Sequence, residues 1–374
     1  MLRNIVRALG AFALAGSATP LLGTPLQVAP VTDCPLRDAP FSASSPLIDV
    51  MLSPQAKAVL DKSFPGKFSK LPPFFSATTP PTFAAILTIK EAGGFVGLKP
   101  ADIDAADKAL RALPVTKADR IARCARYDND VPLFDLPKGK RHVLLFEKIN
   151  GFKDVPSFNA AHAMFTAMAA RKGFTLVASD KGGLFNRKSL AQFDAVIWNN
   201  ISGDVLSLSQ RKALQAYMAK GGAFIGVHGS AGDPVYFWDW YTHTLLGARF
   251  LMHPMSPQFQ EARVIIDDPQ SPITRGLPKE WRMRDEWYSF KASPRASGAH
   301  VLAALDEATY NPVGMMGMNL RMGDHPIAWT RCLGRGRMFY SAIGHLPETY
   351  TEPHYLMMLE NAVDWATASK TCAR

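Results

Sequence analysis

The chain has 374 residues, enough for one large domain or two ordinary ones, and 47% of them are hydrophobic, which predicts a sizeable core and excludes a disordered chain. The formal net charge is +10, but the basic residues are spread thinly and form no stripe with aromatic residues. Nucleic-acid grooves combine basic and aromatic residues in this way, so we expect no nucleic-acid partner. The charge indicates only a basic soluble protein.

Residues 1–18 have the layout of a secretory signal peptide. A basic start, MLRNIVR, precedes the apolar run ALGAFALAG, and Gly16-Ser17-Ala18 offers small residues for cleavage. This run is too short to span a membrane, and no later run approaches eighteen apolar residues. We therefore predict cleavage after Ala18, a mature chain without a membrane span, and a periplasmic or secreted location.

The cysteine pattern agrees with export. The chain has four cysteines and no CxxC pair, and in an oxidising compartment an even count of this kind favours disulfides over a zinc site. Two bridges allow three pairings. We favour Cys34–Cys124 and Cys332–Cys372, because each pair then lies within one region of the chain. Buried free thiols are the alternative.

Two segments precede the main domain. Residues 19–45 are rich in Pro, Ser, Thr and Ala, and we expect a linker there. Residues 46–130 carry only helical patterns and predict a small helical region. Within it, Ser53-Pro54 is typical of a helix start, PPTFAAILTIKEAGGF predicts a helix closed by Gly93-Gly94, and Pro100 begins a further helix.

Strand and helix patterns alternate in residues 141–368. HVLLFEKI, FTLVASD, FDAVIWNNI and AFIGVHG predict strands, and helical patterns of about fifteen residues lie between several of them. The alternation predicts an α/β domain with a doubly wound, mostly parallel sheet. Beyond residue 233 the pattern is less regular, with strand-like pieces, a hairpin that turns at Gly334-Arg335-Gly336, and a closing helix.

His228 directly follows the apolar run Ala223–Val227. Parallel sheets bind ligands at the carboxyl ends of their strands, where a histidine can serve as a general base, a metal ligand or a hydrogen-bond donor to a hydroxyl. The alternative is a histidine that only satisfies a loop carbonyl. The run from Gly226 to Ser230 has the spacing of a nucleophile elbow, but a histidine occupies the central position, which argues against a nucleophile.

Other polar residues follow further strand patterns. Asp285 and Glu286 precede two aromatic residues, and carboxylates beside aromatic rings suit the binding of a sugar. Because neighbouring strand residues point to opposite faces, we expect only one of these two carboxylates to face a given site. A turn with core aromatics is the alternative. We predict that the catalytic residues are His228, His345, Asp285 and Glu286. The predicted substrate-binding residues are Asp154, Asn199, Ser230, Trp287, Tyr288, Asp324, His325 and Glu348. His243 and His253 are more typical of structural histidines.

Several runs of the chain resemble the ThuA-like (trehalose utilisation) family. They are Tyr217–His228, Asp285–Tyr288, Gly323–Trp329 and Gly334–His345, in order and with similar spacing over about 141–368. The resemblance implies a class I glutamine amidotransferase-like, flavodoxin-like fold, with His228 near the position of the amidotransferase cysteine. It also implies a link to disaccharides and keto-sugar derivatives.

One departure from the family concerns the segment after the first strand. Many members carry Gly-Phe-Arg-His there, whereas this chain has Gly151-Phe152-Lys153-Asp154. Asp154 therefore substitutes for that histidine, or the site differs here. No cysteine lies at a strand-to-helix turn of the α/β region, which excludes a cysteine nucleophile.

Three hypotheses follow. In the first, an exported enzyme acts on a carbohydrate or keto-sugar derivative by acid–base chemistry of histidine and carboxylate, through isomerisation, elimination or hydrolysis; a carboxylate then holds the sugar or a bound divalent metal. In the second, the protein is a non-catalytic periplasmic sugar-binding module. In the third, the helical region docks a partner protein. Convergence of His228, His345 and a carboxylate distinguishes the first hypothesis. The sequence leaves the oligomeric state open.

Overall fold

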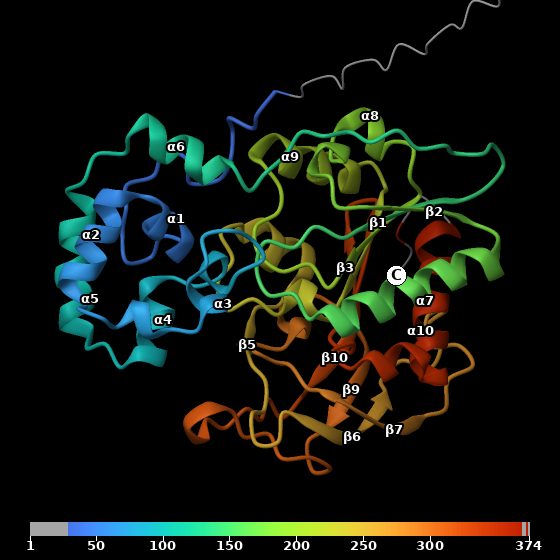
Figure 1. Cartoon of the computed structure of the whole chain (residues 1–374). Coiled ribbons are helices and arrows are strands. Elements are labelled where there is room, and N and C mark those ends of the chain that lie inside the picture. Colours follow the sequence, from blue (N-terminus) through green and yellow to red (C-terminus); the bar gives the residue numbers. More distant parts are fainter. Residues whose placement is uncertain (1–28, 369–371, 373–374) are drawn as a thin grey trace, which may run out of the picture.

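The structure is a computed structural model that describes residues 29–368 and Cys372. The predicted signal peptide and the first part of the predicted linker lie outside the described residues. Figure 1 shows a group of N-terminal helices beside a larger part in which helices surround a sheet.

The N-terminal part is helical, as its sequence pattern predicts. Its elements are α1 (Leu47–Leu52), α2 (Pro54–Ser63), α3 (Pro73–Ser76), α4 (Ile89–Val96), α5 (Pro100–Arg111) and α6 (Lys117–Cys124), with short 3₁₀ turns at Phe68–Lys70 and Phe83–Ala85. The Ser53 side chain accepts a hydrogen bond from the Ala56 N–H and so caps α2. The helix predicted to close at Gly93-Gly94 instead ends at Gly97, whose φ of +65° suits a C-terminal cap.

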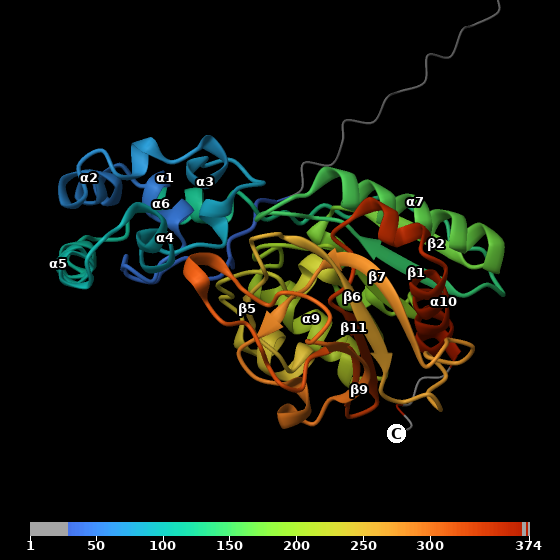
Figure 2. The same cartoon turned by 90° about the horizontal axis from the view of Figure 1, so that it is seen from below.

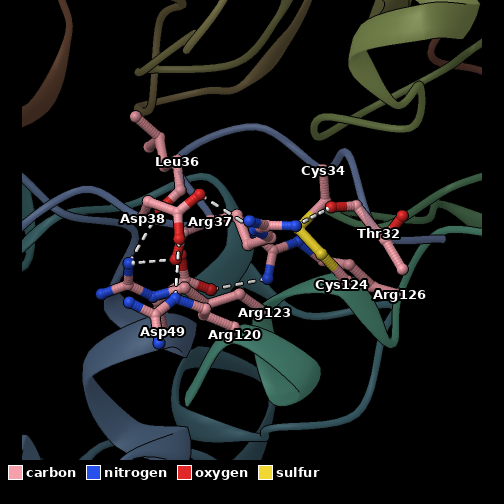
Figure 3. Close-up of a disulfide and its surroundings, with 10 residues drawn as sticks. All are labelled: Thr32, Cys34, Leu36, Arg37, Asp38, Asp49, Arg120, Arg123, Cys124 and Arg126. Atoms are coloured by element: carbon pink, nitrogen blue, oxygen red, sulfur yellow. Dashed lines mark hydrogen bonds and ion pairs between the residues drawn. A yellow bond between two sulfur atoms is a disulfide. The ribbon is translucent and has the colours of Figure 1, made fainter. Parts of the chain in front are cut away.

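Residues 29–45, expected as part of a linker, pack against these helices. Figure 3 shows the Cys34–Cys124 disulfide, which joins this segment to the end of α6. The Arg123 guanidinium donates to three backbone carbonyls of the segment, those of Leu36, Arg37 and Ala39, at 2.7–3.0 Å. A buried ion pair between Arg126 and Asp49 (2.6 Å) lies beside it.

The larger part contains a nine-stranded sheet of order β2-β1-β3-β4-β11-β10-β9-β6-β7. The neighbours from β2 to β11 pair in parallel, and the neighbours from β11 to β7 pair antiparallel. The strands are β1 (His142–Phe146), β2 (Thr175–Ser179), β3 (Ala195–Asn199), β4 (Ala223–Val227), β6 (Phe259–Ile266), β7 (Glu280–Glu286), β9 (His300–Asp306), β10 (Pro326–Leu333) and β11 (Gly336–Ser341). The predicted α/β class and the predicted hairpin are confirmed.

Helices cover both faces of the sheet. Helices α7 (Val155–Lys172) and α10 (Pro353–Ala368) lie side by side, joined by ion pairs such as Lys172–Asp364 (2.8 Å), while α9 (Leu208–Ala219) lies across the strands from them in Figure 2. The remaining elements are α8 (Arg187–Leu190), a π-helix (Trp240–Leu246), and the two-stranded sheet of β5 (Phe250–Met252) and β8 (Ser289–Phe290). Strands buried on both sides explain the near-continuous apolar runs that mark them in the sequence.

The favoured cysteine pairing is confirmed: Cys34 bonds to Cys124, and Cys332 of β10 bonds to Cys372. Disulfides form and persist in oxidising compartments such as the extracellular space, so these two bridges indicate a location of that kind. Within residues 29–368, none of the helices has both the length and the apolar character needed to cross a membrane.

Candidate functional site

The backbone at His228 forms a sharp strand-to-helix turn. His228 follows β4 and opens a 3₁₀ turn (His228–Ala231), and its φ of +36° lies in a region that residues with a side chain rarely adopt. The Tyr340 hydroxyl donates to the His228 carbonyl (2.8 Å), and the Gly229 N–H donates to Asn200 Oδ1 (3.1 Å). These bonds hold the strained turn and present the imidazole at the carboxyl edge of the sheet.

Three titratable side chains converge at this edge. His228 Nε2 lies 3.1 Å from His345 Nδ1, which lies 2.9 Å from Glu286 Oε2, and His228 Nε2 is 3.4 Å from the same oxygen. The side chains are almost buried, with 4%, 12% and 1% exposure for His228, His345 and Glu286. The convergence that the enzyme hypothesis requires is therefore present.

The imidazole of His228 is oriented by its neighbours. Its Nδ1 lies 2.7 Å from the Ala342 carbonyl oxygen, and a carbonyl accepts only, so Nδ1 carries a proton. In the neutral ring Nε2 then carries a lone pair, which can accept a hydrogen bond from His345 Nδ1. The Tyr288 ring stacks on His228, with the ring centroids 4.2 Å apart.

Asp285 holds the loop that carries His345. Its carboxylate accepts hydrogen bonds from the N–H groups of Gly344 (2.8 Å), His345 (3.0 Å) and Leu346 (3.2 Å). As expected, only one of the two neighbouring carboxylates, that of Glu286, touches the histidine side chains. Strand β7 ends at Glu286, so Asp285 binds the backbone of the His345 loop while Glu286 binds its imidazole.

The loop approaches His228 closely because residue 344 is a glycine. Gly344 has a φ of +138°, and a Cβ at this position would lie 2.5 Å from the Tyr350 hydroxyl oxygen and 3.1 Å from the His228 Cβ. Only a residue without a side chain fits this approach.

Burial and hydrogen bonding shift the pKa values in opposite directions. For Glu286, burial alone would raise the pKa, but the imidazoles of His228 and His345, when they carry a proton on the facing nitrogen, donate to the carboxylate and lower its pKa well below the ordinary value. For His345, burial lowers the pKa, and the hydrogen bond and charge of Glu286 raise it above the usual value for histidine. Burial raises the pKa of Asp285, against the effect of the His228 charge and several hydrogen-bond donors.

The sequence did not predict two contacts of Glu286. His253 Nδ1 lies 3.2 Å from Glu286 Oε1, and the Gln258 side-chain amide donates to the same oxygen. Both residues come from a loop without periodicity between β5 and β6, so no pattern indicated them. His253, which the sequence favours as structural, therefore borders the site.

Three predicted substrate-binding residues have buried side chains with partners inside the protein. Ser230 Oγ donates to the Trp198 carbonyl (2.9 Å), and the Asn199 amide donates to Glu147 (2.8 Å) and to the Phe158 carbonyl (3.1 Å). The Trp287 indole is 1% exposed and donates to the Gln260 carbonyl (2.9 Å), which places it in the core with no face open to a sugar. Tyr288 is the member of this predicted set that contacts the cluster directly.

The other predicted residues lie around the cluster or apart from it. Asp154 caps α7 by accepting from the Ser157 N–H (3.0 Å), and its charge contributes to the raised pKa of His345. His325 is buried against Glu307 (2.8 Å) and the Tyr288 carbonyl (2.9 Å). Asp324 is exposed and pairs with Arg295 (2.9 Å), and Glu348 is exposed after the His345 loop.

Aromatic rings from two parts of the chain flank His345. Phe259 and Phe152 have ring centroids 5.1 Å and 6.2 Å from its imidazole. Phe83, from the N-terminal helical part, lies 5.1 Å from Phe152, whose surface is 40% exposed. The helical part therefore contributes to one wall beside the cluster, which its sequence alone did not indicate.

A cavity of about 630 Å³ lies elsewhere on the sheet. Its lining includes Asp194, Gly221 and Gly222, which immediately precede β3 and β4. It therefore opens at the amino ends of these strands, opposite His228. Parallel sheets bind their ligands at the other edge, so the His228 cluster is the candidate site.

Comparisons with known proteins found similar solved structures and one protein family. A putative ThuA-like protein from Bacteroides uniformis is 25% identical and superimposes with a TM-score of 0.54, covering 62% of this chain and 94% of that one. A putative ThuA-like protein from Parabacteroides merdae is 15% identical, with a TM-score of 0.46 and coverage of 63% and 92%. No curated protein sequence matches the chain. The ThuA family, described as trehalose utilisation, matches residues 142–366, more than half of the chain. The chain therefore belongs to the ThuA family.

Proposed function

We propose that the protein is an exported enzyme that acts on a carbohydrate or keto-sugar derivative by acid–base chemistry at His228, Glu286 and His345. Membership of a family described as trehalose utilisation supports a carbohydrate-related role in general. The observation that carries the proposed chemistry is the contact of two imidazoles and one carboxylate within 3.4 Å at the carboxyl edge of the sheet.

The arrangement suits proton transfer beside a carbonyl group. His228 has its tautomer fixed by Ala342, so its Nε2 can accept a proton, and His345 is hydrogen-bonded to Glu286, which stabilises a protonated imidazole. A keto group acidifies the neighbouring C–H bond of a sugar. Removal of that proton by one histidine would give an enolate or enediolate. Protonation of the neighbouring carbon by the other histidine would complete an isomerisation, whereas cleavage of the C–O bond at the β-carbon, with protonation of the departing oxygen by the other histidine, would complete an elimination.

Hydrolysis by a pair of carboxylates fits this site less well. Glycosidases of that type use two free carboxyl groups that flank the scissile bond. Here Asp285 is fully buried and accepts from four backbone N–H groups and from the Thr349 hydroxyl (3.0 Å). It is therefore committed to holding the loop, and Glu286 is the only carboxylate of the pair in contact with the histidine side chains.

The aromatic wall supports a ring-shaped ligand. Sugar rings pack their apolar faces on aromatic side chains, and Phe152, which is 40% exposed, has its ring centroid 6.2 Å from that of His345. We include Phe152 and Phe83 among the proposed substrate contacts, together with Tyr288. The disulfides support the proposed periplasmic or secreted location.

Product analysis with disaccharides and 3-keto-glycosides tests this proposal. We expect turnover by the wild-type protein and a loss on the order of 100-fold or more in E286Q and H345A, because a positioned acid or base contributes about this much. The control is H162A, because His162 also pairs with a carboxylate, Glu147 (3.0 Å), but lies outside the cluster. Sugar binding without turnover, unchanged in H228A, would instead identify a binding module.

A further inference from the structure

We propose that His228, Glu286 and His345 together bind one divalent transition-metal ion. This inference rests on the proposed function for the location of the active site. It adds a cofactor, which would bind the sugar oxygens next to the reacting carbon.

The distances among the three ligand atoms fit a metal. His228 Nε2, His345 Nδ1 and Glu286 Oε2 are 2.9–3.4 Å from one another. Zinc binds imidazole nitrogen and carboxylate oxygen at about 2.0–2.2 Å, so its neighbouring ligand atoms lie about 2.9–3.5 Å apart in tetrahedral or octahedral geometry. One ion can therefore touch all three atoms with little movement of the side chains.

The electron pairs of the cluster also favour a cation. The Nδ1 proton of His228 points to Ala342, so its Nε2 lone pair faces the negatively charged Glu286 Oε2 at 3.4 Å. The single His345 Nδ1 proton can point at only one of these two acceptors. A cation among the three atoms would displace the proton from His345 Nδ1, so that all three atoms offer a lone pair, and would remove the repulsion between these lone pairs in a site that is shielded from water.

The surroundings resemble the outer shell of a metal site. Metal-binding histidines usually donate their other N–H to a carbonyl or carboxylate, as His228 does to Ala342 (2.7 Å). Glu286 is oriented through its second oxygen by Gln258, and Asp285 fixes the backbone of His345. The ligands come from three separate elements, the turn after β4, the end of β7 and the loop after β11, so the fold itself assembles them.

A second buried histidine–carboxylate pair, His325 and Glu307, differs from the His228 cluster. His325 Nε2 faces the Tyr288 carbonyl (2.9 Å), and His325 Nδ1 faces Glu307 (2.8 Å) and the Tyr310 hydroxyl (3.1 Å). No third ligand joins this pair among the described residues. Within residues 29–368, the His228 cluster is the group that brings three ligand atoms close to one point.

The ligand set indicates the class of metal. Two imidazoles and one carboxylate suit zinc, manganese or iron, whereas calcium and magnesium prefer oxygen ligands. Three protein ligands leave coordination positions for water or substrate oxygens, as in catalytic zinc sites. With a metal bound, the two histidines would serve as ligands and a metal-bound water would supply the base, so the location and substrate class of the proposed function would stay and the identity of the base would change.

Metal binding can be measured without any substrate. Untagged protein is stripped with a chelator, dialysed, and titrated calorimetrically with Zn²⁺ and with Mn²⁺, and the bound metal is counted by elemental analysis. We expect one equivalent of at least one of these ions in the wild-type protein. Removing a ligand in E286Q or H345A should weaken binding by at least about 100-fold, whereas H162A should bind as the wild type does. Circular dichroism checks that each variant folds.

The outcomes separate this inference from the proposed function. Failure of the wild-type protein to bind one equivalent of either ion, or equal binding by wild type, E286Q and H345A, overturns the metal site. Turnover of a keto-glycoside by the stripped protein would then still support the acid–base enzyme. Metal binding that depends on Glu286 and His345, without turnover of any sugar, supports the site and contradicts the proposed reaction.

Discussion

At the scale of single residues, Asp233 predicts a measurable dependence of stability on pH. Burial raises its pKa from 3.8 to about 7, against the hydrogen bonds from the Ser202 hydroxyl (2.5 Å) and the Gly203 N–H (2.6 Å). Between about pH 4 and pH 7 the folded protein keeps a proton that the unfolded chain releases. Its contribution therefore lowers the free energy of unfolding as the pH rises through this window, by at most about 4 kcal/mol.

D233N tests the contribution of this carboxyl group. An asparagine can still accept from Gly203 and can donate to the Ser202 hydroxyl, but it does not titrate. Urea unfolding at several pH values between 4 and 7.5 should therefore show a smaller loss of stability with rising pH in D233N than in the wild-type protein. Equal slopes in the two proteins would contradict the raised pKa.

The sequence predicted the three cluster residues because each follows a strand pattern. His228 and His345 come after apolar runs, and Glu286 ends a strand, so position along the chain was sufficient. Position was not sufficient for the role of Asp285, whose partners are backbone N–H groups on the distant His345 loop, or for His253, which lies on an irregular loop. Trp287 is buried and therefore cannot contact a sugar. The sequence did not indicate this, because burial depends on packing between distant segments.

At the scale of elements, helix α7 provides a test of Asp154. The Asp154 carboxylate accepts from the Ser157 N–H (3.0 Å), so D154A should lower the free energy of unfolding by about 1 kcal/mol. D154N keeps an oxygen that can cap the helix and should retain most of the stability. Chemical denaturation of the two variants measures the difference.

The same pair of variants tests whether Asp154 has taken over a role of the family histidine. If Asp154 only caps the helix, D154N should turn over a sugar substrate about as fast as the wild-type protein. A loss of activity in D154N at unchanged stability would show that its charge acts on the site, where it already contributes to the raised pKa of His345.

The sheet shows why its parallel half was easier to predict than the rest. Strands alternating with helices predicted β1 to β4 in parallel, since each crossover helix leaves its own periodic pattern. The antiparallel half has no such helices. Four strands lie between β4 and β7 in the sheet, namely β11, β10, β9 and β6. Glu286 at the end of β7 nevertheless contacts His228, which follows β4. The antiparallel strands therefore curl back toward the parallel half, and this curvature completes the site.

At the scale of the whole molecule, the two disulfides should stabilise the protein to different extents. Cys34 and Cys124 are 90 residues apart, whereas Cys332 and Cys372 are 40 residues apart. A bridge that closes a longer loop removes more conformational entropy from the unfolded chain, and the difference between these two loops is about 0.7 kcal/mol. Each bridge is expected to contribute about 2–5 kcal/mol in total.

Contacts in the folded protein should further increase the difference in stabilisation between the two disulfides. The Cys34–Cys124 bridge holds the segment whose carbonyls bind Arg123, so its loss also loosens those hydrogen bonds (Figure 3). We therefore expect the double variant C34A/C124A to unfold at a lower denaturant concentration than C332A/C372A, with both below the wild-type protein. Because the N-terminal part carries Phe83 beside Phe152, C34A/C124A should also weaken sugar binding more than C332A/C372A does. The opposite order of stabilities would show that the N-terminal segment is held by its packing and not by the bridge.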